Sequence, residues 1–181
     1  GFPVGPMTLI DEVGIDVGAH IAEGALGDFF EKRGEKRSNK MRELADAGFK
    51  GRKSKKGFLQ YDEKGKKVRG KVNEEIYSFF GSSSRKEIDP QIIQDRMSLM
   101  MINEAAMCLQ EGIIESPLDG DIGAIFGLGF APFTGGPFRY MDKVGLDSIL
   151  SKFEKYKNLG DRFKPAKILT DNAQSNIIFY S

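Results

Sequence analysis

Two residue types on which catalytic and metal sites often depend are scarce in this 181-residue chain. Cys108 is the only cysteine, which excludes an intrachain disulfide and a thiolate-rich zinc site. His20 is the only histidine, so mechanisms and metal sites that need two imidazoles are excluded as well. No apolar run reaches the roughly 20 residues that a membrane-spanning helix requires. The sequence thus predicts no metal site and no membrane span.

Charge of one sign is also lacking, because the formal net charge is only +1. No global field therefore selects a polyanionic partner. Charged residues make up 29% of the chain and apolar ones 40%, a balance typical of globular proteins. The chain begins with Gly-Phe-Pro and not with methionine, from which we expect a piece of a longer protein.

An internal repeat organises the sequence. The segment GPMTLIDEVGID at residues 5–16 recurs as GPFRYMDKVGLD at residues 136–147. Proline suits the first position of a helix, and the glycine after valine suits its C-terminal cap. Asp16 and Asp147 are expected to N-cap the helices that follow. The repeat predicts two copies of one helical unit.

The remaining patterns also indicate helices. After Asp16, apolar residues recur every four positions and predict one helix with a buried stripe, formed by Val17, Ile21, Ala25 and Phe29. Asp89-Pro90 is a strong helix start, and the run to residue 111 should be the longest helix, apolar on two faces and buried. Shorter helices are expected at residues 38–48, 73–80, 119–126, 137–142, 147–156 and 165–172. Residues 48–71 are dense in Lys, Arg and Gly and predict a solvated loop, and Gly81 to Ser84 a flexible break.

Three segments resemble the duplicated C-terminal domain of 3-hydroxyacyl-CoA dehydrogenases. They are GFPVGPMTLIDEVGID at residues 1–16, its echo LGFAPFTGGPFRYMDKVGLD, and MINEAAMCLQEGIIESPLDGDIGAIFG between them. Within this family, NEAAMCLQEGI, GDIGAIFGLGF and the ending Phe179-Tyr180-Ser181 look most like the mitochondrial trifunctional protein α subunit. The resemblance implies a mitochondrial, matrix-side location, with association to the inner membrane.

The resemblance implies an all-α fold of two tandem repeats, of the type found in the C-terminal domain of 6-phosphogluconate dehydrogenase. Residues 1–72 would form the first repeat, truncated at its N-terminus and carrying the basic linker, and residues 73–181 the second. Related enzymes carry an enoyl-CoA hydratase domain and a Rossmann domain that binds NAD and holds the catalytic His-Glu pair. We therefore expect no catalytic, cofactor-binding or metal-binding residue in this chain, which alone should be inactive.

The resemblance also implies where substrate lies. The rigid turn of Pro3, Val4, Gly5 and Pro6 would face the acyl chain of a 3-hydroxyacyl-CoA, although a simple helix-entry role is equally consistent with its echo at Gly135 to Pro137. Phe126 could line the same surface or lie in the core.

Other polar residues are better explained by structure than by catalysis. Asp11 and Asp142 recur at equivalent positions, which favours a capping or packing role. Asn103 and Glu104 lie on the expected buried helix, where polar groups need partners, and are predicted to tie the repeats together. His20 has no nucleophile indicated nearby, so a catalytic role for it is disfavoured.

Several partners remain open. Homo-oligomerisation is expected, because the surface that the first helix of repeat one would cover should expose apolar side chains. An alternative function is an assembly module, in which the second repeat and the basic run at residues 50–71 dock a thiolase β subunit or make a peripheral contact with an anionic membrane. That run could equally attract CoA phosphates or be a solvated loop. Nucleic-acid binding is disfavoured, because interleaved aromatic residues are nearly absent.

Overall fold

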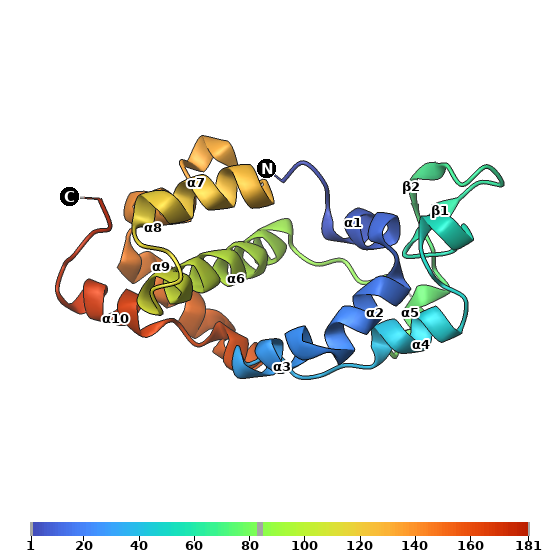
Figure 1. Ribbon diagram of the computed structural model, residues 1–181, viewed down its shortest axis with the longest axis horizontal. Coiled ribbons are helices and arrows are strands. Elements are labelled where there is room, and N and C mark those ends of the chain that lie inside the picture. Colours follow the sequence, from blue (N-terminus) through green and yellow to red (C-terminus); the bar gives the residue numbers. More distant parts are fainter. Residues whose placement is uncertain (1, 83–84, 181) are drawn as a thin grey trace. The chain divides into compact units, whose positions relative to one another are not determined.

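The structure, a computed structural model, describes residues 2–82 and 85–180 (Figure 1). These residues form two compact units, which we call the N-terminal unit (Val4–Glu87) and the C-terminal unit (Ile88–Ser181 together with Gly1–Pro3). Helices dominate both units, which confirms the predicted all-α class apart from one short pair of strands. Among the described residues, no helix is long and apolar enough to cross a membrane.

The N-terminal unit contains, in its described residues, five α-helices and a small hairpin. Its elements are α1 (Pro6–Val13), α2 (Ile15–Glu23), α3 (Ala25–Lys32), α4 (Lys40–Asp46), the 3-10 turn η1 (Arg52–Ser54), β1 (Leu59–Tyr61), β2 (Lys67–Val72) and α5 (Ile76–Phe79). The buried centre consists of Ile15, Leu44, Ala45, Phe49 and Ile76. Helix α5 and the core residue Ile76 therefore belong to this unit, which ends at residue 87, whereas the repeat boundary was expected after residue 72.

The apolar stripe predicted to be buried lies at the surface instead. The single helix expected there is divided at Gly24 into α2 and α3. Val17, Ile21 and Phe29 are each about two-fifths exposed, and the residues of α2 that are buried are Ile15 and Ala19. The spacing identified an apolar face correctly, but the prediction of its burial was wrong because α2 turns the face with Ile15 and Ala19 toward α4.

The segment expected to be a solvated loop contains the antiparallel pair of β1 and β2. Its turn is built by Asp62, whose carboxylate accepts the backbone N–H groups of Lys64 (2.9 Å) and Lys66 (2.8 Å). Gly65 supplies the positive φ, +72°, that this turn needs. The loop prediction was wrong here because side-chain contacts of the aspartate to the backbone stabilise a hairpin in a lysine-rich segment. Of the predicted flexible break, Ser83 and Ser84 lie outside the described residues.

The C-terminal unit is organised around its longest helix. Its elements are α6 (Pro90–Gln110), α7 (Pro117–Leu128), η2 (Pro132–Thr134), α8 (Pro137–Val144), α9 (Leu146–Tyr156), η3 (Lys157–Leu159), η4 (Asp161–Phe163) and α10 (Lys167–Gln174). Helix α6 contacts α7, α8, α9 and α10 (Figure 1). The predicted start is confirmed, since the Asp89 carboxylate accepts the N–H of Gln91 at 2.8 Å and Pro90 opens the helix. Leu99, Ile102 and Ala106 are fully buried on one face.

The second apolar face predicted for α6 is only partly covered. Ile93 and Met97 are each 44% exposed, so full burial of this face was a wrong prediction. The buried face packs against aromatic and aliphatic side chains from the surrounding helices, including Phe138, Met141, Ile149, Phe153, Phe163 and Leu169. The core of the unit is therefore one-sided with respect to α6.

Both copies of the repeat end their first helix at a glycine, as expected. Gly14 and Gly145 adopt φ values of +114° and +86°, which only glycine reaches without strain. The predicted N-caps are wrong, because α2 and α9 start immediately after these glycines, at Ile15 and Leu146. Asp16 lies in the first turn, where its carboxylate pairs with Lys53 at 2.6 Å.

Candidate functional site

Each copy of the repeat carries one aspartate that binds a distant stretch of backbone. Asp11 is 1% exposed, and its carboxylate accepts the N–H groups of Phe58 and Leu59, each at 2.9 Å. It also accepts the Tyr61 hydroxyl at 3.0 Å. Burial and then this hydrogen bond to the carboxylate raise the pKa of Tyr61. The side chain is saturated by donors, which confirms the predicted structural role of Asp11.

Asp142 repeats this arrangement in the other unit. Its two oxygens accept the N–H groups of Phe179 and Tyr180, each at 2.9 Å. The Tyr180 hydroxyl donates to Asp121 at 2.6 Å, and the ring lies beneath the guanidinium of Arg139 at 3.5 Å. Burial first, and then the bond to Asp121, raise the pKa of Tyr180 to about 12. Asp142 therefore secures the end of the chain.

Asp121 is a buried polar residue that sequence reasoning missed. It is 2% exposed and accepts the N–H groups of Phe138 (2.7 Å) and Arg139 (3.2 Å) at the start of α8. A methyl group on Gly136 would lie 2.4 Å from this carboxylate, so the glycine permits the close approach. The only signal was an aspartate followed, some fifteen residues later, by a Gly-Gly-Pro helix start. That signal indicates a turn and does not identify its acceptor.

The predicted substrate turn straddles the division between the two units. Pro3 belongs to the C-terminal unit and Val4 to the N-terminal unit. Phe2 packs edge-to-face on Phe130 with ring centroids 5.9 Å apart, and Pro3 lies so close to Gly129 that a methyl group there would approach the proline ring at 3.0 Å. Phe2-Pro3 thus rests on the segment Gly129-Phe130, its own counterpart in the second copy of the repeat. Val4, Gly5 and Pro6 are all exposed.

Phe126 lies on the outer face of α7 and is 84% exposed. A core position for this aromatic ring is therefore excluded. Leu118 and Ile122, at four-residue spacing on the same helix, are 54% and 49% exposed and continue an apolar strip. Pro3 reaches the end of α7 through Gly129, so the structure brings Pro3 and Phe126 to the same helix of one unit.

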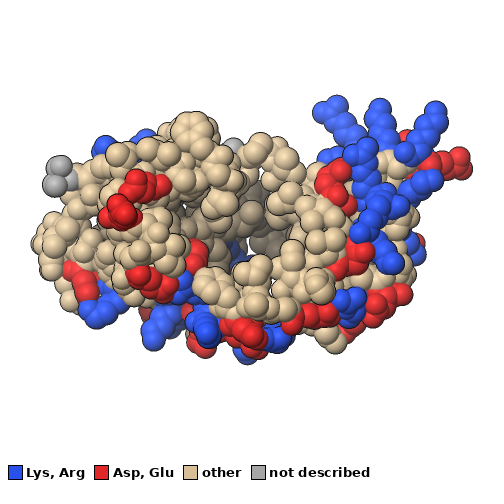
Figure 2. All heavy atoms as spheres, viewed as in Figure 1, with Lys and Arg blue, Asp and Glu red and all other residues tan. Residues whose placement is uncertain are grey.

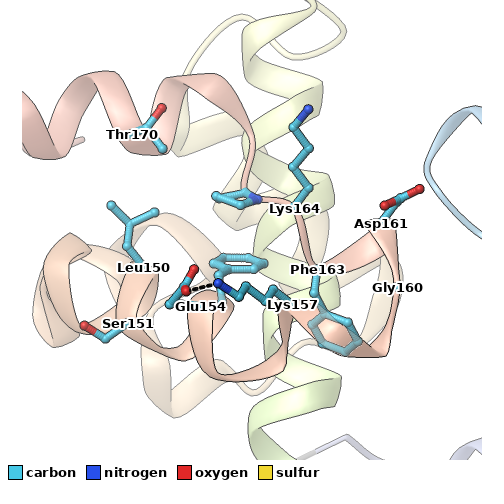
Figure 3. A pocket seen from close by; sticks show the side chains of 11 residues that line it. Leu150, Ser151, Glu154, Lys157, Gly160, Asp161, Phe163, Lys164 and Thr170 are labelled. Carbon is cyan, nitrogen blue, oxygen red and sulfur yellow. Dashed lines mark hydrogen bonds and ion pairs between the residues drawn. The ribbon is translucent and has the colours of Figure 1, made fainter.

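The hollows of the surface lie elsewhere. One opens between α9, η4 and α10 and is lined by Leu150, Glu154, Phe163 and Thr170 among others (Figure 3). Its most prominent polar feature is an ion pair between Glu154 and Lys157. Asp161 and Lys164 also line the hollow, so it holds exposed charged side chains but neither the histidine nor the cysteine of the chain.

Titratable groups in the C-terminal unit also form structural pairs. Asp95 is 5% exposed and binds Lys152 (2.9 Å), Gln91 (3.0 Å) and Tyr156 (3.2 Å). Burial opposes ionisation of Asp95, but the hydrogen bonds, that of Lys152 foremost, outweigh it and lower its pKa. The same bond raises the pKa of Lys152. Asp95 therefore connects α6 to α9 and does not face a substrate.

Two further predictions concern polar side chains. Asn103 is 3% exposed, donates to the carbonyl of Lys164 (3.0 Å) and accepts the N–H of Ala166 (2.8 Å). Both partners belong to the C-terminal unit, so the prediction that Asn103 ties the repeats together was wrong. His20 is exposed on α2. Within the described part of the chain, no cluster of three or more His, Cys, Asp or Glu side chains could hold a metal ion.

Comparisons with known proteins indicate the family to which this chain is similar. Residues 1–61 match the family model described as "3-hydroxyacyl-CoA dehydrogenase, C-terminal domain". The chain is 49% identical, over 99% of its length, to the fatty acid oxidation complex subunit alpha of Shewanella loihica and to that of Idiomarina loihiensis. The chain spans about a quarter of the length of these curated relatives.

Two solved structures share the fold. The dehydrogenase part of multifunctional enzyme 1 from C. elegans matches 94% of this chain and 39% of its own, with a TM-score of 0.59 and 20% identity. The 3-hydroxybutyryl-CoA dehydrogenase of Escherichia coli matches 97% of this chain and 52% of its own, with a TM-score of 0.64 and 20% identity. At this identity the likeness concerns the fold alone.

The relatives correct one expectation. Shewanella and Idiomarina are bacteria, which have no mitochondria. The expected mitochondrial location was therefore wrong, and the closer likeness to the mitochondrial trifunctional protein is not supported.

Proposed function

We propose that this chain is a 3-hydroxyacyl-CoA dehydrogenase C-terminal domain and that it supplies the helical substrate-facing part of such a dehydrogenase within a bacterial fatty-acid β-oxidation multienzyme. The observation that carries the proposal is the 49% identity, along 99% of the chain, to fatty acid oxidation complex α subunits. The enzyme as a whole would oxidise the 3-hydroxyl group of a 3-hydroxyacyl-CoA and would also contain an enoyl-CoA hydratase domain.

The described residues do not fit the NAD on which this chemistry depends. Dinucleotides bind where a parallel strand leads through a glycine-rich turn into a helix. Among the described residues, the strands are the antiparallel β1 and β2, and β2 leads to the four-residue α5 without such a turn. We therefore assign NAD and the residue that removes the hydroxyl proton to another domain of the enzyme, and no catalytic step to this chain.

The contribution of this chain would be an apolar surface for the acyl group. Pro3 and Phe126 are exposed on the C-terminal unit, and Phe2 beside them is 40% exposed. Apolar side chains that remain in water cost free energy, and covering them with an acyl chain recovers part of it. Such a surface would orient the substrate and keep water from the reacting carbon. Val4, Gly5 and Pro6, which lie on the N-terminal unit, stay predicted substrate contacts.

Truncation of Phe126 in the dehydrogenase that contains this chain tests the proposal. We expect Phe126→Ala to raise KM for a long-chain 3-hydroxyacyl-CoA roughly tenfold with little change in kcat, because an apolar contact made equally in the ground and transition states is lost. Phe133→Ala is the matched control, since Phe133 is 80% exposed on the same unit but is not one of the residues predicted to contact substrate. Equal KM values for all three proteins would contradict the substrate contact.

Self-association forms the second part of the proposal. Met7 and Val13 on α1 are 47% and 50% exposed, whereas Phe138 and Met141 on the equivalent helix α8 are fully buried. An apolar face without a cover favours association. We expect dimers or larger species. Light scattering that shows a monodisperse monomer at a chain concentration on the order of tens of micromolar would contradict this expectation. Docking of a thiolase β subunit stays a prediction, to be tested by pulldown.

A further inference from the structure

The hairpin of β1 and β2 carries an unusual density of positive charge. Five of its side chains are cationic and all five are exposed: Lys64, Lys66, Lys67, Arg69 and Lys71. Figure 2 shows Lys and Arg side chains gathered over the hairpin that Figure 1 labels β1 and β2. We call residues 59–72 the basic hairpin. Because the net charge of the chain is only +1, this is a local patch and not a property of the whole surface.

The five cations differ from their neighbours in lacking acidic partners. Arg52, Lys53 and Lys56 form ion pairs with Glu12 (3.0 Å), Asp16 (2.6 Å) and Glu75 (2.8 Å). Among the residues that the structure describes, none of the five hairpin cations forms an ion pair. The basic run thus contains three paired cations near η1, whereas Lys50, Lys55 and the five hairpin cations form no ion pair among the described residues.

Two exposed carboxylates of the hairpin, Asp62 and Glu63, offset part of its charge and leave five cations less two anions, a formal +3. Asp62 is also held by the backbone N–H groups of Lys64 and Lys66. Lys67 and Arg69 are two residues apart on β2 and so project from one face of the strand. Val68 between them is half-buried on the other face. The cations thus point into solvent while the strand is anchored from behind.

The chemistry of the patch narrows the kind of partner. Stable protein interfaces centre on buried aromatic or large aliphatic side chains. In the hairpin, Leu59, Tyr61 and Val68 are already half-buried, and Val72 is 38% exposed. A nucleotide site would need a cavity or a stacking ring, but the hollows identified in both units are lined by other residues. The nearest ring, Tyr61, is held by Asp11. Four lysines on long flexible stems suit a diffuse negative surface better than a shaped ligand.

We propose that the basic hairpin binds the phosphodiester headgroups of an anionic phospholipid bilayer. Clusters of four to eight Lys and Arg side chains are sufficient for such attraction, which acts within about one Debye length of the surface. The contact would be peripheral and reversible, with no segment inserted. It does not depend on the dehydrogenase role and could hold for the chain whatever reaction its enzyme performs.

Co-sedimentation of the 181-residue chain with vesicles tests this inference. We expect binding to vesicles of equimolar phosphatidylcholine and phosphatidylglycerol at about 0.1 M salt, loss of binding at about 0.5 M salt, and no binding to phosphatidylcholine alone. Lys67→Gln/Arg69→Gln/Lys71→Gln should weaken the partition coefficient on the order of a hundredfold, at about fivefold per cation. Lys32→Gln/Lys86→Gln/Lys164→Gln removes the same charge elsewhere and should bind almost as the parent chain does.

Several results would overturn the inference. No binding to the anionic vesicles at low salt would do so, and so would equal losses in the hairpin and control variants. Retention on immobilised polyglutamate or on CoA, without vesicle binding, would assign the hairpin to an acidic polypeptide or a soluble phosphate ligand instead. If circular dichroism shows that the hairpin triple variant is unfolded, Lys64→Gln/Lys66→Gln in the turn decides, because those side chains contact nothing that holds the fold.

Discussion

Replacing Asp11 with asparagine tests the contact that fixes the hairpin to the first helix. The carboxylate accepts three hydrogen bonds, from Phe58, Leu59 and Tyr61, and is 1% exposed. The amide of asparagine has one oxygen, so its nitrogen must face at least one donor. Hydrogen bonds to a buried charge contribute about 1.5–3 kcal/mol each, and an unsatisfied buried donor costs about 1–3 kcal/mol. We expect the free energy of unfolding of the N-terminal unit to fall by about 3 kcal/mol.

Urea denaturation followed by far-ultraviolet circular dichroism gives that free energy, and hydrogen exchange locates the change. Asp11→Asn should accelerate exchange at Phe58 and Leu59 and leave Phe179 and Tyr180 unaffected. Asp142→Asn is the matched control and should do the reverse. Destabilisation below about 0.5 kcal/mol, or faster exchange in both segments with one substitution, would refute the assignment of the two aspartates to separate, equivalent contacts.

Three other predictions concern the C-terminal unit. The pKa of Asp95 is lowered in the folded chain, so its ionised form stabilises the fold at pH values above the unfolded pKa, near 3.8. This contribution is lost as the pH falls through the lowered folded pKa. The urea midpoint of the parent chain should therefore decline at acid pH, and that of Asp95→Asn should change less. The raised pKa of Lys152 places the opposite loss at alkaline pH, above its usual value of 10.5, and Lys152→Met should remove it. Asn103→Ala leaves the carbonyl of Lys164 and the N–H of Ala166 without their partner, so thermal denaturation should show a loss of about 2–4 kcal/mol, and a loss under about 1 kcal/mol would mean that water replaces the amide.

Local signals in the sequence were sufficient for most helices. Asp89-Pro90 predicted the start of α6 because a carboxylate cap and a proline at the first helical position are both effects of neighbouring residues. The glycines at 14 and 145 ended their helices for the same reason. The repeat itself was visible because the turn, the helix and its stop recur in the same order.

Features that depend on distant residues could not be read in this way. The hairpin was missed because Asp11, which holds β1, lies 47 residues before Phe58. The stripe with Val17 and Ile21 was identified as apolar, but its exposure depends on which helices lie next to α2. Asp16 was assigned as a cap because its actual partner, Lys53, lies 37 positions further along the sequence. No local pattern indicates an ion pair between residues so far apart.

The candidate substrate surface came from a resemblance and not from composition. The sequence pattern favoured a core position for Phe126 over a surface one, because its helix is apolar on more than one side, and that preference was wrong. Only the packing of α7 on α8 shows that the ring faces outward. Asp121, which orders the start of α8, had no signature distinct from an ordinary surface aspartate.

Absorbance at 340 nm tests most directly whether this chain lacks the chemistry of the reaction. Purified chain at micromolar concentration, mixed with a 3-hydroxyacyl-CoA and NAD, should produce no NADH above the uncatalysed rate. Its buried carboxylates, Asp11, Asp95 and Asp121, are held by backbone amides or an ion pair, and its one histidine is exposed on α2. Turnover that rises in proportion to chain concentration and survives removal of contaminating dehydrogenase would show that a catalytic group lies within these residues.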